Sequence, residues 1–165
     1  MRLSNLVKVI SKYSLDSIMK WVWRVWCLLY FIILFYVVFF AGRRPNPTFE
    51  STDSRPLLLI PFKMKWYLYK HAIDVNSVYL DILGNIVMFV PLPLFLYIVW
   101  KVKRPHTMFW IGFIASFIVE FTQYITGVGL ADIDDLVFNS LGVLCGVTII
   151  DGIKRTAFET ERSNN

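Results

Sequence analysis

Long apolar runs separated by short polar segments are the dominant pattern in this chain. The first run covers residues 25–42 and holds 18 residues without a charge. In a helix it would span roughly 27 Å, close to the thickness of the hydrocarbon core of a bilayer. Similar runs follow downstream. The pattern therefore predicts four transmembrane helices, at 21–42, 82–100, 107–125 and 134–150.

Composition points the same way. The chain has 165 residues, of which 56% are hydrophobic and 18% charged, whereas soluble domains carry about a quarter charged residues. A soluble domain of this size buries only about two-thirds of its surface, too little to hide so much apolar area. We therefore expect an all-α, multi-pass protein of the cell membrane, with the lipid bilayer as its surroundings. Despite a net charge of +5, nucleic acid is not an expected partner, because the basic residues flank the apolar runs.

Three further segments complete the division of the chain. Residues 1–20 are either an amphipathic basic helix on the membrane surface or a solvated leader. Residues 43–81 form a connection in which basic and aromatic residues alternate from Lys63 to His71, a pattern typical of the lipid headgroup level. Residues 151–165 form a polar tail, and the predicted core of the protein is 82–150.

Lysine and arginine in the short flanks predict the orientation. Five lie in the leader up to Arg24, three in the 101–106 loop and three in the tail, but none lies in the 126–131 turn. Both termini should therefore be cytoplasmic, while 43–81 and 126–131 face outward. Six basic residues within 43–81 argue against this orientation, but the leader and the short central loop outweigh them.

Two prolines interrupt the second span. Pro91 and Pro93 lack an N–H, so the carbonyls of Val87 and Phe89 lose their helical donors. The sequence allows a tolerated kink or a broken helix that lines a site.

Polar side chains converge on one end of the predicted bundle. In the predicted topology the second span begins outside, the third ends outside and the fourth begins outside. The unusual polar residues occupy these three ends, and helical spacing places them on shared faces. The predicted outward pocket consists of Asp81, Asn85, Glu120, Gln123, Asp132, Asp135 and Asn139.

The carboxylates of this pocket carry its chemistry. Glu120 lies in an apolar run, and an intramembrane charge normally faces the bundle interior or water. Asp132, Asp134 and Asp135 can cap a helix N-terminus, but three carboxylates in four residues also call for a cation, a proton or a basic partner. Oxygen ligands suit Ca²⁺ or Mg²⁺, so Glu120, Asp132 and Asp135 are candidate metal ligands. No other cofactor is expected.

Several segments, which follow one another in the same order as in the family, resemble the VanZ family of small bacterial membrane proteins. This family includes a teicoplanin-resistance protein. The segments are Leu58–Phe62, the Asn-x-x-x-Phe-x-Pro stretch ending at Pro91, Glu120-x-x-Gln123, Asp132-Ile-Asp-Asp135 and Asn139-x-x-Gly142. The resemblance covers about residues 55–150. It implies a plasma-membrane protein linked to the response to glycopeptides, without a known reaction.

Two positions depart from the family pattern. Pro93 stands where relatives often have glycine, and Val128 stands where many carry an arginine. We therefore expect the acidic cluster to lack an internal counter-ion.

The leading hypothesis is a non-enzymatic protein whose pocket binds a lipoglycopeptide, a cell-wall lipid precursor or a cation, because no nucleophile is matched to the carboxylates. One alternative is an enzyme acting on a lipid-linked envelope substrate, with Glu120 as acid or base. Another is a structural or assembly subunit. Gly142 and Gly146 permit close helix packing, within the bundle or in an oligomer.

Overall fold

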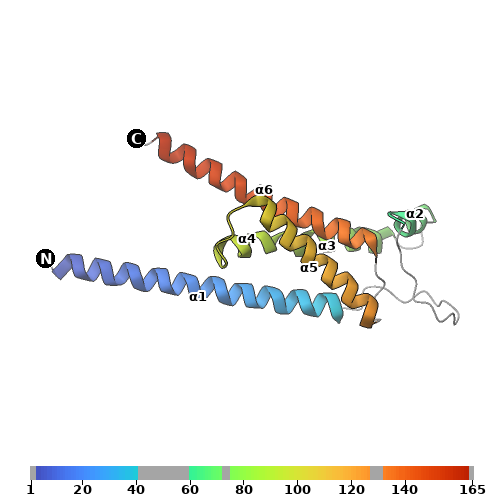
Figure 1. Ribbon diagram of the computed structural model, residues 1–165, viewed down its shortest axis with the longest axis horizontal. Coiled ribbons are helices and arrows are strands. Elements are labelled where there is room, and N and C mark those ends of the chain that lie inside the picture. The colour runs from blue at the N-terminus through green and yellow to red at the C-terminus, as the bar shows by residue number, and fades with distance from the viewer. Residues whose placement is uncertain (1–2, 41–59, 72–74, 127–131, 164–165) are drawn as a thin grey trace.

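The computed structural model describes residues 3–40, 60–71, 75–126 and 132–163. These residues form α-helices and contain no β-strand (Figure 1). Much of the expected 43–81 connection and most of the 126–131 turn, including Val128, lie outside the described residues. The helices are α1 (Leu3–Phe39), α2 (Lys63–Lys70), α3 (Val75–Phe89), α4 (Pro91–Ile98), α5 (Pro105–Thr126) and α6 (Ile133–Ser163).

Four helical segments are long and apolar enough to cross a membrane, which confirms the predicted all-α, four-span architecture. They are Leu15–Phe39, Val78–Ile98, Pro105–Thr126 and Ile133–Ser163. The start of α1 and the end of α6 lie at the same end of the molecule, and α2 lies at the opposite end (Figure 1). We call this opposite end the cluster end.

The centre of the bundle is α6, which packs against α3, α4 and α5. Apolar side chains from all four helices interlock there, and Phe89, Met108 and Val143 are almost completely buried. The core consists of Phe89, Leu92, Leu96, Met108, Val143, Val147 and Ile150. Packing of this kind holds transmembrane helices together, because lipid tails are as apolar as the side chains themselves.

The first helix runs along the outside of this core. The predicted leader and first span form one continuous helix, α1, because no proline or glycine interrupts the chain before Gly42. The Tyr30 hydroxyl donates a hydrogen bond of 2.8 Å to the Met88 carbonyl. The ring of Phe95 contacts Tyr30 and Trp23, with centroids 5.1 and 6.4 Å apart. Aromatic contacts and this partly buried hydrogen bond therefore help to attach α1 to the rest of the bundle.

The second span is kinked at Val90. The predicted helix 82–100 begins earlier, at Val75, and is divided into α3 and α4. Val90 itself keeps helical dihedral angles (φ −56°, ψ −42°), and its N–H still reaches the Ile86 carbonyl at 3.3 Å. The structure therefore resolves the alternative left open by Pro91 and Pro93: the chain bends without unwinding.

Glycines let α6 approach this kinked span. A Cβ added at Gly142 would overlap the Ile86 carbonyl oxygen, and one at Gly146 would overlap the Val90 carbonyl oxygen. Only a residue without a side chain permits this backbone contact. The small-residue pair is therefore used within the bundle, next to the kink.

Candidate functional site

A buried lysine is the centre of the polar site. Lys65, on α2, has a side chain that is only 7% exposed, and its ammonium group lies among carboxylates from two other helices. The Nζ atom is 3.0 Å from Asp132, 3.1 Å from Asp135 and 3.2 Å from Asp81, and 3.6 Å from Asp134. We call these five residues the Lys65 cluster. The expectation that the acidic residues lack an internal counter-ion is therefore wrong.

The start of α6 places three of these carboxylates together. Asp132 precedes the helix, and its Oδ1 atom accepts a hydrogen bond of 2.9 Å from the Asp134 N–H. This is the N-cap geometry that satisfies a free helical donor. The other oxygen of Asp132, Oδ2, accepts a hydrogen bond from the Lys65 ammonium. Both roles considered for the acidic run, capping and pairing with a basic partner, are thus filled by one side chain.

Phe62 fixes the approach of α2 to α6. Its backbone is left-handed (φ 60°), a conformation that costs a non-glycine residue about 1–2 kcal/mol. Its N–H donates to Asp134 Oδ1 at 2.7 Å, and its ring meets the Phe138 ring edge-on at 6.0 Å. The Lys65 ammonium lies 5.5 Å from the centre of the same Phe138 ring. These contacts offset the strain and hold the lysine in place.

Glu120 extends the site to α5. Its side chain is buried, and Oε2 accepts a hydrogen bond of 3.2 Å from the Asp132 N–H. As expected for an intramembrane carboxyl group, it faces the bundle interior. This bond links the third and fourth spans just beside the Lys65 cluster.

A layer of amide and hydroxyl groups lies one helical turn deeper. Asn139 Nδ2 donates to Ser116 Oγ at 2.9 Å, and both residues are buried. Asn139 Oδ1 has no hydrogen-bond partner among the described residues. Asn85, also buried, is one turn along α3 from Asp81. Deeper still lies the apolar core, so the polar region ends partway through the bundle.

Gln123 is placed elsewhere. Its Nε2 atom donates a hydrogen bond of 3.0 Å to the Val38 carbonyl near the end of α1. Gln123 thus joins the first and third spans. The spacing of Glu120 and Gln123 predicted that both residues lie on one side of the helix. It did not show which of the other helices each side chain would contact.

The candidate metal ligands Asp132 and Asp135 belong to the Lys65 cluster, and Glu120 lies beside it. In the described part of the chain, no three His, Cys, Asp or Glu side chains are grouped so that they could hold a metal ion. The Lys65 ammonium lies between the aspartates and is the basic partner that was one of the three alternatives for the acidic run. Among the described residues, four aspartates lie within 3.6 Å of the Lys65 ammonium, and Glu120 is joined to them through the Asp132 N–H.

The sequence reasoning missed Lys65, Phe62, Asp134 and Ser116 as site residues. Lys63, Lys65 and Lys70 lie within one short segment, and no spacing rule separates the buried lysine from the exposed ones. The excess of carboxylates was the usable signal, because buried charges are normally paired. It called for a cation, a proton or a basic partner without showing which of the three is present.

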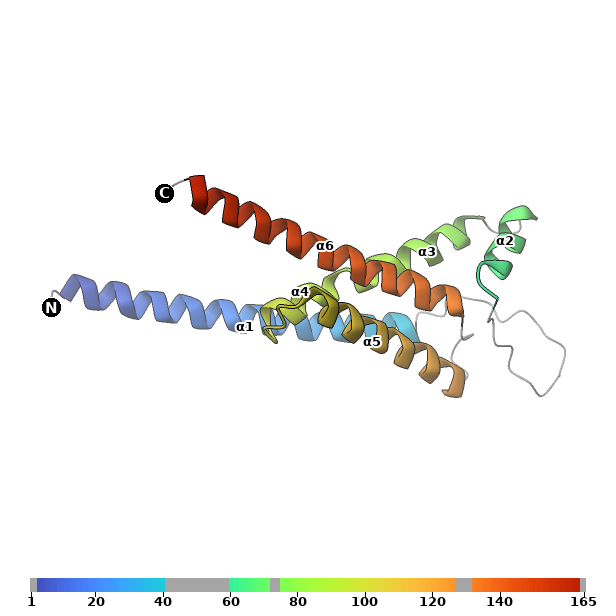
Figure 2. The same cartoon turned by 45° about the horizontal axis from the view of Figure 1, so that its top comes forward.

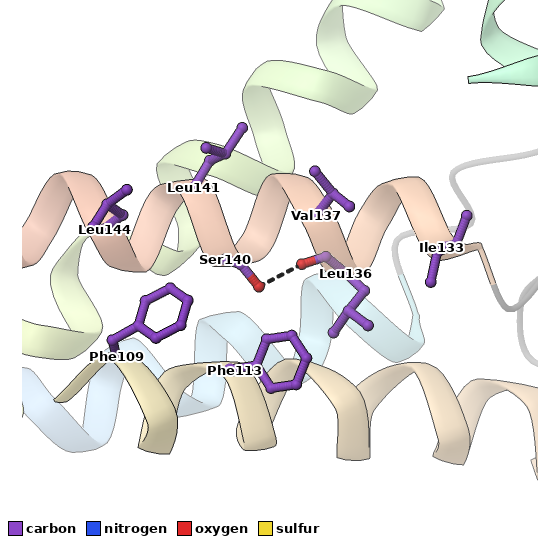
Figure 3. A pocket seen from close by; sticks show the side chains of 8 residues that line it. All are labelled: Phe109, Phe113, Ile133, Leu136, Val137, Ser140, Leu141 and Leu144. Carbon is purple, nitrogen blue, oxygen red and sulfur yellow. Dashed lines mark hydrogen bonds between the residues drawn. The ribbon is translucent and has the colours of Figure 1, made fainter. Parts of the chain in front are cut away.

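A groove between α5 and α6 lies beside the site. It has a volume of about 420 Å³ and lies within the membrane-spanning segments. Phe109 and Phe113 project from α5 toward α6, and the Ser140 hydroxyl is engaged with the Leu136 carbonyl at 2.7 Å (Figure 3). The groove therefore presents apolar surface. Its lining residues are Phe109, Phe113, Ile133, Leu136, Val137, Ser140, Leu141 and Leu144.

Fold and site together define a small polytopic membrane protein with four apolar spans and a buried ionic cluster at one end. The sequence profile of the family described as VanZ/LLP1 matches residues 27–154. The chain belongs to this family, and the matched region contains every residue of the Lys65 cluster. No curated protein and no solved structure matches the chain.

Proposed function

We propose that this protein acts in the plasma membrane in the response to glycopeptides of the teicoplanin type, through the Lys65 cluster and Glu120. The observation that carries the proposal is the burial of one ammonium group among four aspartates from α3 and α6. A buried charged network of this kind inside a membrane protein is costly and usually serves a function. Family membership supplies the link to the cell envelope.

The buried aspartates define the kind of ligand that we propose. A cationic group of a lipoglycopeptide, or of a cell-wall lipid precursor, would be attracted to the cluster and would compete with Lys65 for the aspartates. The apolar core beneath the polar layer supports binding at one end of the bundle in preference to passage through it. We expect this end to face outward.

The test is teicoplanin and vancomycin susceptibility in a sensitive Gram-positive host. Wild type should lower teicoplanin susceptibility, whereas Lys65→Met and Glu120→Gln should return it to the level of the empty host. Lys103→Met, at an exposed lysine in the loop between α4 and α5, is the matched control and should behave like wild type. All variants are compared at equal abundance in the membrane. A wild type that accumulates normally and changes neither susceptibility would contradict the proposal.

A second candidate is an enzyme or carrier for a lipid-linked envelope substrate. The groove between α5 and α6 favours it, because an apolar groove that starts at Ile133 could hold a lipid tail next to the acidic end of α6. Thermal stabilisation of the purified protein by Mg²⁺, Mn²⁺ or Ca²⁺, lost in Asp132→Asn, would support this candidate. If Glu120→Gln changes only the abundance of a complex, the protein is instead an assembly subunit.

A further inference from the structure

The two sides of α2 differ sharply in their surroundings. Lys65 points into the bundle and is buried, whereas the aromatic residues around it are exposed. Trp66 is 64% exposed and Tyr69 50%, and their rings lie side by side with centroids 6.1 Å apart. Lys63 and Lys70, at the two ends of the helix, are exposed as well. A short helix thus presents an aromatic surface flanked by two positive charges.

The position of α2 relative to the spans is set by Lys65. Its ammonium binds Asp81, three residues into the span that begins at Val78, and Asp132, directly before the span that begins at Ile133. Helix α2 therefore lies at the level where two apolar spans begin. This level corresponds to the boundary between hydrocarbon and headgroups.

The orientation of α2 also fits this boundary. Both views show α2 beyond the ends of α3 and α6, with its axis crossing the long axis of the bundle (Figure 1, Figure 2). A helix that lies across the ends of transmembrane helices runs along the membrane surface. Indole and phenol rings prefer this layer, where their apolar bodies and polar tips are both satisfied.

We propose that α2 is docked on the headgroup layer of the membrane that the chain spans, with Trp66 and Tyr69 in the interface and Lys63 and Lys70 beside anionic lipid phosphates. Lys65, which is buried, connects this docked helix to the aspartates. The lipid surface thereby holds α2 over the Lys65 cluster and stabilises the ion pairs. This inference goes beyond the proposed function, because it requires no antibiotic or other ligand.

Charge complementarity identifies lipid as the occupant of the exposed face. Lysines are attracted to the phosphates of an anionic membrane surface, and exposed aromatic rings add apolar anchoring. A protein partner would also cover aromatic residues. If the exposed face of α2 binds a protein partner, it should remain in water in vesicles that contain only this protein. If it binds lipid, it should lie in the membrane interface of the same vesicles.

The experiment measures membrane depth by spin labelling of the full chain. Cys27 and Cys145 are first replaced by alanine, and single labels are introduced by Trp66→Cys and Tyr69→Cys. The protein is placed in vesicles of phosphatidylcholine with a minor share of phosphatidylglycerol. Accessibility to oxygen, relative to a water-soluble nickel chelate, reports how deep each label lies.

Two reference positions calibrate the depth. A label from Ile118→Cys, on the exposed side of α5, should be accessible to oxygen and shielded from nickel. A label from Thr160→Cys, in the last turns of α6, should be accessible to nickel. We expect the labels at 66 and 69 to lie between these references. Nickel accessibility equal to that of the Thr160 position would overturn the proposal.

A second measurement tests the role of the two lysines with the labels at the same positions. Lys63→Glu combined with Lys70→Glu should move the labels toward water in vesicles that contain phosphatidylglycerol. The control Arg162→Glu, remote from α2, should leave them unchanged. If the double substitution leaves the depth unchanged, the lipid-charge part of the proposal fails. Both readouts are independent of antibiotic susceptibility, so the failure of one proposal does not imply the failure of the other.

Discussion

Lys65 shows how one residue can organise three helices in a membrane protein. Its ammonium binds Asp81 on α3, Asp132 before α6 and Asp135 on α6. Breaking a buried ion pair by removing one partner costs about 3–5 kcal/mol, because the remaining charge stays buried and unpaired. The contribution of Lys65 therefore lies mainly in preventing repulsion among the aspartates.

The corresponding prediction concerns stability. Lys65→Met should lower the free energy of unfolding by about 3 kcal/mol or more, because four aspartates lose their shared counter-charge. Lys63→Met removes an exposed charge from the same helix and should change stability by no more than about 0.5 kcal/mol. Both are measured by unfolding in mixed micelles with increasing denaturing detergent. Equal stability of the two variants would show that Lys65 is not needed to balance the cluster.

At the level of elements, α6 decides the packing of the bundle. Its first turn carries Asp134 and Asp135, and its middle carries the glycines that contact the kinked span. Its last turns extend past the predicted end at 150 to Ser163. Because α3, α4 and α5 all pack against it, a change in its position is transmitted to every other part of the core.

Alanine substitutions test this close contact. Gly142→Ala and Gly146→Ala place a methyl group against the Ile86 and Val90 carbonyl oxygens and should each destabilise the protein by about 1–3 kcal/mol, as overpacking does. Gly152→Ala on the same helix meets open space and should be neutral or stabilising by up to about 1 kcal/mol, because alanine favours helix. Thermal unfolding in detergent compares the three. A stable Gly142→Ala variant would contradict the observed proximity of α6 and α3.

On the scale of the whole molecule, four spans bring the start of α1 and the end of α6 to the same side (Figure 1). The distribution of lysine and arginine predicts that this side is cytoplasmic. The cluster end, with α2, would then face outward, where glycopeptides and envelope precursors are encountered.

Fusion reporters test the orientation. Green fluorescent protein fused after Asn165 should fluoresce, whereas alkaline phosphatase at the same site should be inactive, because the phosphatase folds only outside the cytoplasm. In the alanine background at Cys27 and Cys145, Trp66→Cys should react with a membrane-impermeant maleimide added to intact cells. An active phosphatase at Asn165 would reverse the predicted topology.

The number of spans and the end at which the polar residues gather were determined by the sequence alone. Apolar runs match the bilayer thickness, and polar positions such as Asp81, Glu120 and Asp132 recur where these runs begin or end. Local chemistry also predicted the cap formed by Asp132. These features depend on residues that are close together in the sequence, and such residues can be identified without a structure.

Only the tertiary structure decided which residues meet. Lys65 and Asp132 are 67 positions apart, and Gln123 and Val38 are 85 apart. Such pairs depend on the rotation and depth of whole helices, which the packing of all side chains sets together. The bend at Val90 has the same origin, since Pro91 permits either a kink or a break. There the contact of Gly146 with the Val90 carbonyl accompanies a kink that keeps the helical path.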